Sequence, residues 1–259
     1  MRIALGVEYD GTGFSGWQLQ VGVRTVQGCL EEALSRVAAH GVRVHCAGRT
    51  DAGVHGAEQV VHFDTRAERS MRSWVYGANA NLPKTVAVLW ATPVSETFHA
   101  RFSACRRSYR YVIYNRAVRP TFLAWRTTWE YRPLDEGLMH QAAQALVGEQ
   151  DFSSYRAQGC QAKSPVRTVH EICVYRRGEL VFIDIEANAF LHHMVRNIAG
   201  VLMAIGAGER PVAWAAEVLR YRDRARGGVT APPSGLYLTR VGYPSEFQLP
   251  QIQHSAAIW

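Results

Sequence analysis

Residues 48–56, GRTDAGVHG, place a single aspartate, Asp51, between an arginine and a run of small residues. Short apolar runs typical of strands flank this stretch, at residues 42–46 before it and 59–63 after it. Three glycines interrupt the stretch itself. The pattern therefore predicts a loop that is held by a sheet and that presents one carboxylate.

The composition indicates a folded protein with a basic surface. Of the 259 residues, 47% are hydrophobic, and 29 lysines and arginines outnumber 22 aspartates and glutamates. The resulting formal net charge of +7 favours a polyanionic partner. A basic surface that is simply solvated is the alternative interpretation of the same balance.

Cysteine usage and the N-terminus both predict a soluble protein of the cytoplasm. The five cysteines form no C-x-x-C pair, and their odd number suits reduced thiols better than a disulfide framework or a structural zinc site. The N-terminal apolar stretch becomes polar too early for a signal peptide, and no segment has the apolar length of a membrane span. We therefore expect no bound metal and no membrane contact.

The order of predicted elements in the first half returns in the second half. Residues 2–9 have the pattern of a strand, and a helix is predicted from Val26, with Thr25 as its N-cap and Gly41 at its end. In the second half the sequence predicts a strand at 106–115, a helix at 134–146 and a strand pair at 166–176 and 179–190.

This repeated order predicts an α+β fold of two similar halves whose sheets join around a cleft. We expect the first half at residues 1–102 and the second at 103–243. A loosely attached tail is expected at residues 244–259, after Pro244.

Residues 190–205, FLHHMVRNIAGVLMAI, carry apolar residues at helical spacing and predict a mostly buried helix. Arg196 lies within it, and a buried guanidinium requires a carboxylate or several acceptors. The alternative is that Arg196 lies on a narrow polar face and reaches solvent. His192 and His193, being adjacent on this helix, point in different directions and make a poor metal pair. We expect them to be structural or to face RNA.

Two arginine clusters are candidates for RNA contact. In residues 101–120, arginines that include Arg106, Arg107 and Arg110 interleave with tyrosines, as in platforms that bind single-stranded RNA. The alternative is that tyrosines on one face of a strand, Tyr109 among them, line the core. The second cluster predicts a mobile loop that touches phosphate, or a solvated loop, and consists of Arg220, Arg222, Arg224 and Arg226.

Taken together, six motifs resemble the TruA family of tRNA pseudouridine synthases. GRTDAGVHG occurs with YDGTGFSGWQ, HARFSA, YRYVIYN, NAFLHHMVRN and GLYL, in the order of the family, from residue 9 to residue 238. The resemblance implies the pseudouridine synthase fold, with mixed, mainly antiparallel sheets around a central active-site cleft. It also implies a homodimer that binds tRNA.

The resemblance also assigns roles to particular residues. It implies that Asp51 is the catalytic aspartate, that Arg196 pairs with it, and that Arg49 helps to displace the target nucleotide. Tyr109 matches the tyrosine that stacks on the base. The late apolar motif, placed against the uracil, corresponds to Leu236 and Tyr237. The early motif FSGWQ is expected to have a structural role.

The reaction implied by the resemblance isomerises uridine to pseudouridine at positions 38, 39 and 40 of the tRNA anticodon stem-loop. It involves no net oxidation, hydrolysis or energy input, so no cofactor is expected. Because the target atom is inaccessible in a stacked helix, the nucleotide must be flipped out.

Two other functions compete with this interpretation. One is a catalytically silent RNA-binding protein, against which the complete set of Arg49, Asp51, Tyr109 and Arg196 speaks. The other is a hydrolase with a pair of acidic residues, for which Asp10 is the only tempting partner of Asp51. An Asp-Gly turn at the end of a strand is, however, an ordinary structural feature.

Overall fold

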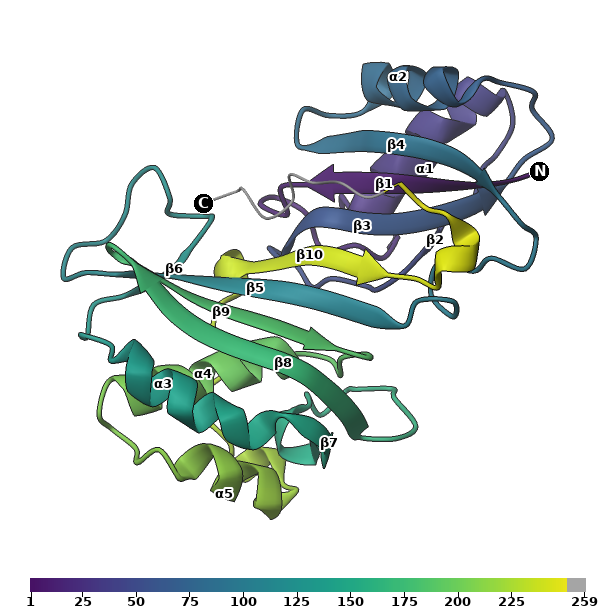
Figure 1. The fold of residues 1–259 in the computed structure, drawn as a ribbon. Coiled ribbons are helices and arrows are strands. Elements are labelled where there is room, and N and C mark those ends of the chain that lie inside the picture. The colour runs from purple at the N-terminus through teal and green to yellow at the C-terminus, as the bar shows by residue number, and fades with distance from the viewer. Residues whose placement is uncertain (251–259) are drawn as a thin grey trace. The chain divides into compact units, whose positions relative to one another are not determined.

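The computed structural model describes residues 1–250, and the chain within it divides into two compact units. One unit combines Met1–Arg106 with the chain from Tyr237 onward, and the other is Arg107–Leu236. Figure 1 shows the course of the chain through both. Each unit contains a sheet and its own helices.

The sheet of the first unit is mixed and mainly antiparallel. Strand β1 (Arg2–Tyr9) lies between β3 (His55–Asp64) and β4 (Val86–Val94) and is antiparallel to both. The two-residue β2 (His45–Cys46) pairs antiparallel with β3. Strand β10 (Leu236–Gly242), from the end of the chain, is parallel to β3.

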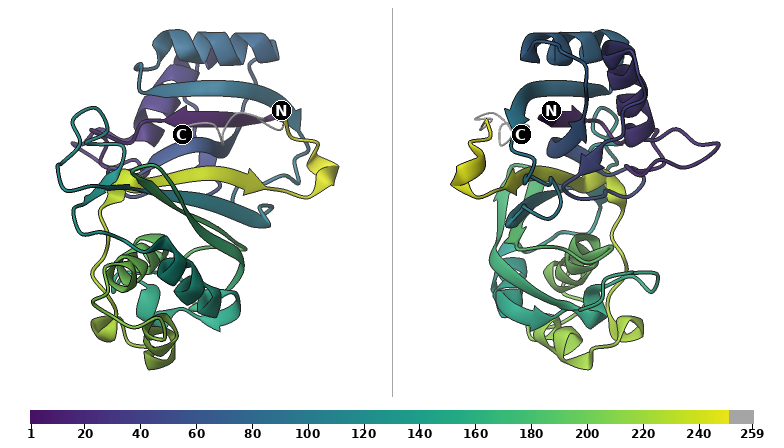
Figure 2. Two further views of the ribbon diagram at one scale, coloured as in Figure 1. Left: turned by 60° about the vertical axis from the view of Figure 1, so that its left-hand side comes forward. Right: turned by 90° about the vertical axis from the view of Figure 1, so that its right-hand side faces the viewer.

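Two helices, α1 (Val26–Ala38) and α2 (Met71–Asn81), pack on this sheet and enclose its core (Figure 2). Thr25 is the N-cap of α1, as predicted, because its side chain accepts a hydrogen bond from the backbone N–H of Gly28. The prediction that Gly41 ends this helix is wrong. The helix stops at Ala38 because Ala39 takes the left-handed conformation, with φ of 57°.

The sheet of the second unit has a meander of antiparallel strands. Its order is β5 (Arg106–Asn115), β9 (Leu180–Ala187), β8 (Val166–Arg177) and β7 (Gly148–Asp151). A short strand, β6 (Thr128–Glu130), pairs parallel with β5.

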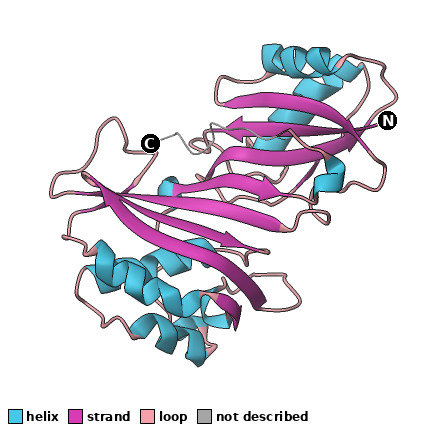
Figure 3. Ribbon diagram, viewed as in Figure 1, coloured by secondary structure: helices cyan, strands magenta, loops and turns pink. Residues whose placement is uncertain are grey.

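Three helices of the second unit pack together beside this sheet (Figure 3). They are α3 (Glu136–Ala143), α4 (Met194–Gly206) and α5 (Trp214–Tyr221). The first of them is shorter than predicted, because Asp135 caps its start and its last predicted turn is a 3-10 helix. The 3-10 helices are η1 (Gln144–Leu146), η2 (Ser153–Tyr155), η3 (Arg224–Arg226), η4 (Pro233–Gly235) and η5 (Ser245–Phe247).

These elements confirm the predicted α+β class and its repeated architecture. In each unit a first strand is followed by a helix and then by two paired strands, and the second strand of that pair returns beside the first strand. The division of the chain differs from the prediction. Residues 237–243 were expected in the second half, whereas β10 pairs with β3 in the first unit.

The start of the predicted tail packs on the rest of the first unit, because the ring of Phe247 meets that of Phe98 edge-on. Just before the tail, the hydroxyl of Tyr243 donates a hydrogen bond to the Ala100 carbonyl at 2.6 Å. The remainder of that tail, residues 251–259, lies outside the described residues. Within residues 1–250, no helix has both the length and the apolar character that crossing a membrane requires.

A buried histidine makes the stability of the first unit depend on pH. The Nδ1 of His62 accepts the backbone N–H of Ala100 at 3.1 Å, and its ring lies 4.6 Å from that of His99. Burial, reinforced by His99, lowers the pKa of His62 to about 4. The unfolded chain therefore binds a proton near pH 6.5 that the folded protein refuses until the pH falls to about 4.

We therefore expect protonation of His62 to lower the free energy of unfolding by about 3 kcal/mol as the pH falls from about 6.5 to about 4. Burial raises the pKa of the Glu58 carboxyl to about 7, which stabilises the folded protein over the same range and offsets the contribution of His62 in the native protein. The variant His62→Gln retains an acceptor for Ala100 but cannot titrate, so its free energy of unfolding, measured with urea, should rise by about 3 kcal/mol relative to that of the native protein as the pH is lowered. An identical pH dependence in both proteins would show that another group is responsible.

Candidate functional site

The loop that carries Asp51 is short and turns tightly. It runs from Ala47 to Val54, between β2 and β3, and the N–H of Val54 donates to the Asp51 carbonyl at 3.2 Å. Gly53 has φ of 77°, which glycine adopts readily. The Asp51 side chain is half-buried. Strand β3 begins at His55, earlier than predicted, so GRTDAGVHG ends inside the sheet.

A buried amide holds the start of this loop. The side-chain NH₂ of Gln59, on β3, donates to the Gly48 carbonyl at 2.6 Å, and the N–H of Gly48 donates back to its Oε1 at 3.4 Å. The N–H of Ala47 donates to the Val60 carbonyl at 2.8 Å. Because Gln59 is fully buried, these bonds are shielded from water and fix the first residues of the loop to the sheet.

The early motif YDGTGFSGWQ holds the middle of the loop. The hydroxyls of Tyr9 and Thr50 lie 2.9 Å apart, and the N–H of Trp17 donates to the Thr50 carbonyl at 3.0 Å. The indole of Trp17 is buried against Tyr9, with ring centroids 5.7 Å apart. These contacts give FSGWQ the structural role that was expected for it. Thr50, the neighbour of Asp51, is bound on both its side chain and its backbone.

His55 connects this loop region to the start of β10. Its buried ring stacks on Tyr237, with centroids 4.5 Å apart and planes 17° apart. Its Nδ1 accepts the N–H of Gly11 at 3.0 Å and lies 3.2 Å from the Asp10 carboxylate. Asp10 also accepts the N–H of Thr12 at 2.9 Å. Asp10 therefore has a structural role in its turn, which weakens the hydrolase hypothesis.

In the second unit, Tyr109 lies on β5 with Tyr111 and Ile113 on the same buried face. Tyr111 lines the core, as the alternative interpretation held, and its hydroxyl donates to the Pro232 carbonyl at 2.8 Å. Tyr109 retains 9% exposure, and its ring meets Phe190 edge to face at 4.9 Å. An aromatic partner thus fixes the orientation of the Tyr109 ring.

Arg196 lies in the first turn of α4 and is half-buried. Its Nε donates to the Ala231 carbonyl at 2.8 Å, and the N–H of Ala231 donates to the Arg196 carbonyl at 3.1 Å. The guanidinium is therefore held at a defined orientation by the backbone that precedes η4. This anchor uses only the Nε–H of a group that has five N–H donors.

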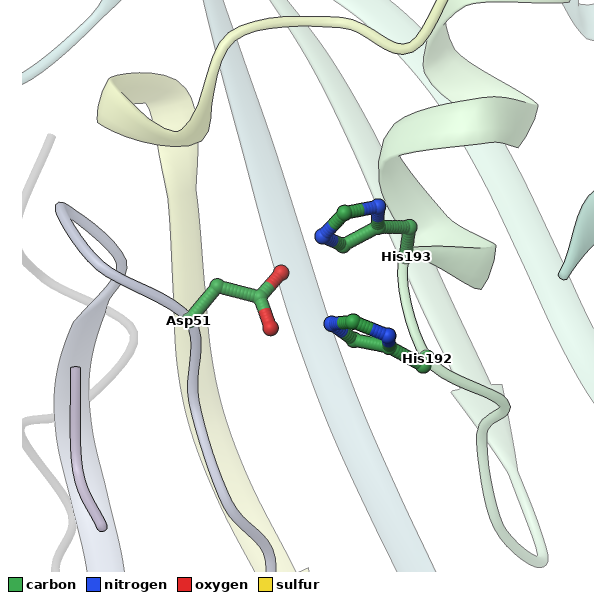
Figure 4. A group of neighbouring side chains, drawn as sticks. All are labelled: Asp51, His192 and His193. Carbon is green, nitrogen blue, oxygen red and sulfur yellow. The ribbon is translucent and has the colours of Figure 1, made fainter. Parts of the chain in front are cut away.

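The prediction that His192 and His193 are adjacent on a helix is wrong. Helix α4 begins only at Met194, because His193 adopts φ of 62°, a left-handed conformation. The two imidazole rings pack on each other, with centroids 4.0 Å apart. Figure 4 draws both rings just before α4, and it draws Asp51 on its own loop in the first unit. Helical geometry therefore does not turn the two side chains away from each other.

The arginines of the first cluster differ in how they are used. Arg107 is buried and donates to the Asn188 carbonyl at 2.8 Å. Arg110 forms a bidentate ion pair with Asp184, at 2.7 and 2.8 Å. Arg106 is exposed. Arg49 is also exposed, and its side chain makes no hydrogen bond or ion pair within residues 1–250. Sequence alone did not distinguish these environments.

The second arginine cluster lies not on one long loop but on a helix end and a 3-10 turn. Arg220 lies in the last turn of α5, which ends at Tyr221, and Arg222 is the C-cap of this helix with φ of 48°. Arg224 donates to Asn197 at 3.1 Å and to Thr230 at 2.8 Å. The last arginine of the cluster lies over the ring of Tyr221. The four arginines are therefore distributed over a capped helix end and a 3-10 turn.

Comparison with known proteins identifies the family. The family model described as tRNA pseudouridine synthase matches residues 6–103 and 142–244. The tRNA pseudouridine synthase A of Nitrosococcus oceani is 62% identical over 259 residues, which is 100% of both chains. The enzyme of the same name from Pseudomonas aeruginosa is 61% identical over 96% of this chain and 88% of its own.

The enzyme from Methylococcus capsulatus is 61% identical over 96% of this chain and 92% of its own length. The two segments that the family model matches include the loop of Asp51 and helix α4, and strand β5 lies between these segments. Identity at this level over nearly complete chains shows more than a shared fold. The chain belongs to the tRNA pseudouridine synthase A (TruA) family, which consists of isomerases.

Proposed function

We propose that the protein converts uridine to pseudouridine at positions 38, 39 and 40 of the tRNA anticodon stem-loop. The observation that best supports this proposal is the Asp51 loop, which buried groups from two other segments hold in place. Such a rigid support suits a carboxylate that must meet a substrate atom at a fixed distance. The family membership supplies the reaction and the tRNA substrate.

The isomerisation breaks the bond between ribose C1′ and uracil N1, turns the base, and joins C1′ to uracil C5. The proton at C5 is lost and N1 gains one, so atoms and electrons balance without a co-reactant. Attack on C6, attack on C1′ and formation of a glycal all require one ionised carboxylate, which we assign to Asp51. We assign Arg196 as its ion-pair partner, because an arginine favours the charged form of a carboxylate.

Nucleotide flipping is assigned to the residues beside the carboxylate and to the aromatic groups. Arg49, exposed and two residues from Asp51, is suited to occupy the space that the flipped nucleotide leaves. Tyr109, held by Phe190, stacks on the flipped base. Leu236 and Tyr237, at the start of β10, lie against the uracil in this proposal.

An enzyme that modifies three neighbouring positions must recognise tRNA by its shape and its backbone charge rather than by bases around one position. We propose phosphate contacts for the exposed Arg106, Arg220 and Arg222, of which Arg222 also lies 3.5 Å from the Asp151 carboxylate. We assign Arg107, Arg110 and Arg224 a supporting role, since each is buried or half-buried and donates to a protein acceptor. We further propose that the enzyme works in the cytoplasm as a homodimer.

Tritium release from tRNA transcripts labelled at C5 of uridine tests this proposal. Transcripts that keep a single uridine at position 38, 39 or 40, with cytidine at the other two, should each release tritium. A transcript with cytidine at all three positions should release none. Release from this last transcript would refute the proposed positions, and binding without release from any transcript would favour the silent RNA-binding protein.

The two hydrogen bonds between Gln59 and Gly48 lead to a separate prediction about turnover. Gln59→Leu removes both hydrogen bonds between the side chain and the half-buried Gly48, so we expect kcat to fall about 10-fold to 100-fold as the Asp51 loop loses its position. Asn79 is a matched control, because its amide holds the backbone of Val88 in the same two-way manner, at 2.8 Å in each direction. Asn79→Leu should leave kcat near the native value, and equal losses in both variants would show a general effect of destabilisation.

A further inference from the structure

The segment 116–131 lies between β5 and the start of α3 (Figure 1). It exposes an unusual number of large aromatic side chains. We call it the aromatic segment. Phe122 is 96% exposed, Trp125 70%, Tyr131 62% and Trp129 42%. Aromatic rings rarely remain in water in such number, because burying each one is favourable. A gathering of this kind marks a surface that binds something.

The charges of the aromatic segment point to the chemistry of its partner. It contains Arg116, Arg119 and Arg126, and Glu130 is its only acidic residue. Glu130 is buried and bound by Arg132, at 2.6 Å. The neighbouring Glu179 accepts a hydrogen bond from Tyr114 at 2.7 Å and lies 3.5 Å from Arg116. Thus the exposed charge of the segment is positive, and it complements a polyanion.

The backbone of the aromatic segment is held by its own hydrogen bonds. The indole N–H of Trp129 donates to the Arg116 carbonyl at 2.9 Å, and the Nε of Arg116 donates to the Val118 carbonyl at 2.7 Å. The hydroxyl of Thr127 donates to the Leu123 carbonyl at 3.0 Å. These bonds tie both ends of the loop that displays Phe122, so a ligand meets rings on an ordered loop and less entropy is lost on binding.

We propose that the aromatic segment is a tRNA-binding surface on which unpaired bases outside the isomerised nucleotide stack. Exposed rings beside arginines, without a free carboxylate, form the combination that binds unstacked bases and their phosphates. The inference rests on the proposed function insofar as the nucleic acid is the tRNA substrate. It adds a second point of attachment that positions the substrate without taking part in the chemistry.

Two variants of Phe122 separate stacking from a simple apolar contact. Phe122→Leu keeps an apolar side chain but removes the ring, so we expect the Kd for a tRNA transcript, measured by filter binding, to rise about 10-fold. Phe122→Tyr keeps the ring and should bind as the native protein does. Tyr76→Leu is the matched control, since Tyr76 on α2 is a 65% exposed ring with the guanidinium of Arg72 beside it. It should leave the Kd unchanged.

Besides the Kd from filter binding, tritium release gives KM and kcat for each variant, and light scattering gives its molecular mass. If the inference is correct, Phe122→Leu raises KM, retains kcat at saturating tRNA and keeps the native molecular mass. A native Kd for Phe122→Leu would overturn it, as would a fall in molecular mass, which would show that the aromatic segment joins two protein chains. The native protein is assayed in parallel. If only this inference is wrong, the native protein still releases tritium from tRNA. If the proposed function is wrong, no sample releases tritium.

Discussion

Asp51→Asn should abolish pseudouridine formation while leaving tRNA binding intact. The substitution preserves the shape of the side chain but removes the charge, and an amide can neither attack the substrate nor withdraw a proton as a carboxylate does. We expect kcat to fall by about 10⁴-fold or more, as is found when a reacting group is removed. Tritium release and filter binding on the same preparation measure the two properties separately.

Asp10→Asn is the control for this result, because Asp10 is the only rival carboxylate that the sequence offered. It accepts the N–H of Thr12 and contacts His55, so its loss should disturb a turn and reduce turnover only modestly. Comparable losses at Asp10 and Asp51 would instead point to a pair of acidic residues that act together. Native turnover by Asp51→Asn would show that Asp51 is not the catalytic carboxylate.

Gly11→Ala should also reduce turnover sharply, although residue 11 is not proposed to touch the substrate. A Cβ at this position would stand 2.0 Å from the carbonyl oxygen of Val54, at the end of the Asp51 loop. Because the obstacle is backbone and not a flexible side chain, the loop or the turn of Gly11 must move. Displacement of a reacting group by about 1 Å can cost about 10²-fold in rate, which is the loss we expect in kcat.

Gly41→Ala controls for the addition of a methyl group to the same unit, since a Cβ there meets nothing within 4 Å. This variant should retain native kcat, and circular dichroism should show that both proteins are folded. If Gly11→Ala retained native turnover, the contact between the early motif and the Asp51 loop would not position the carboxylate. If Gly11→Ala failed to fold, Gln59→Leu would test the same claim, because Gln59 holds the start of the Asp51 loop.

The elements with strong local signals could be predicted from the sequence. Strand β1 has a short apolar run with turn residues after it, and Thr25 supplies the N-cap of α1. Strand β5 was predicted with the bounds that the structure has. These signals lie within a few residues of one another along the chain, so no tertiary contact is needed to interpret them.

The elements that depend on distant contacts could not be predicted. Strand β10 follows the second unit in sequence, but its hydrogen bonds to β3 place it in the first unit. The start of α4 is set by the left-handed conformation of His193, which the apolar spacing of residues 190–205 does not reveal. Helix α2, strand β4 and helix α5 were not predicted at all.

In the candidate site, too, local motifs could be predicted from the sequence, whereas contacts between distant residues could not. The motif around Asp51 is distinctive enough to single out one carboxylate, yet nothing in the sequence marks Gln59 as the side chain that holds Gly48. Among the arginines, Arg110 and Arg49 look alike in sequence. One forms a bidentate ion pair with Asp184 and the other is exposed. Partners that lie far away in the chain decide which arginines remain available to RNA.

The central claim is that this chain isomerises uridine in tRNA with its own side chains. The most direct test is to dialyse the purified protein against a chelator, incubate it with a tRNA transcript that has uridines at positions 38, 39 and 40, and analyse the nucleosides by chromatography and mass spectrometry. The account predicts that uridine is replaced by pseudouridine, an isomer of equal mass, without any added metal or cofactor. Recovery of unmodified uridine alone, from tRNA that the protein demonstrably bound, would contradict it.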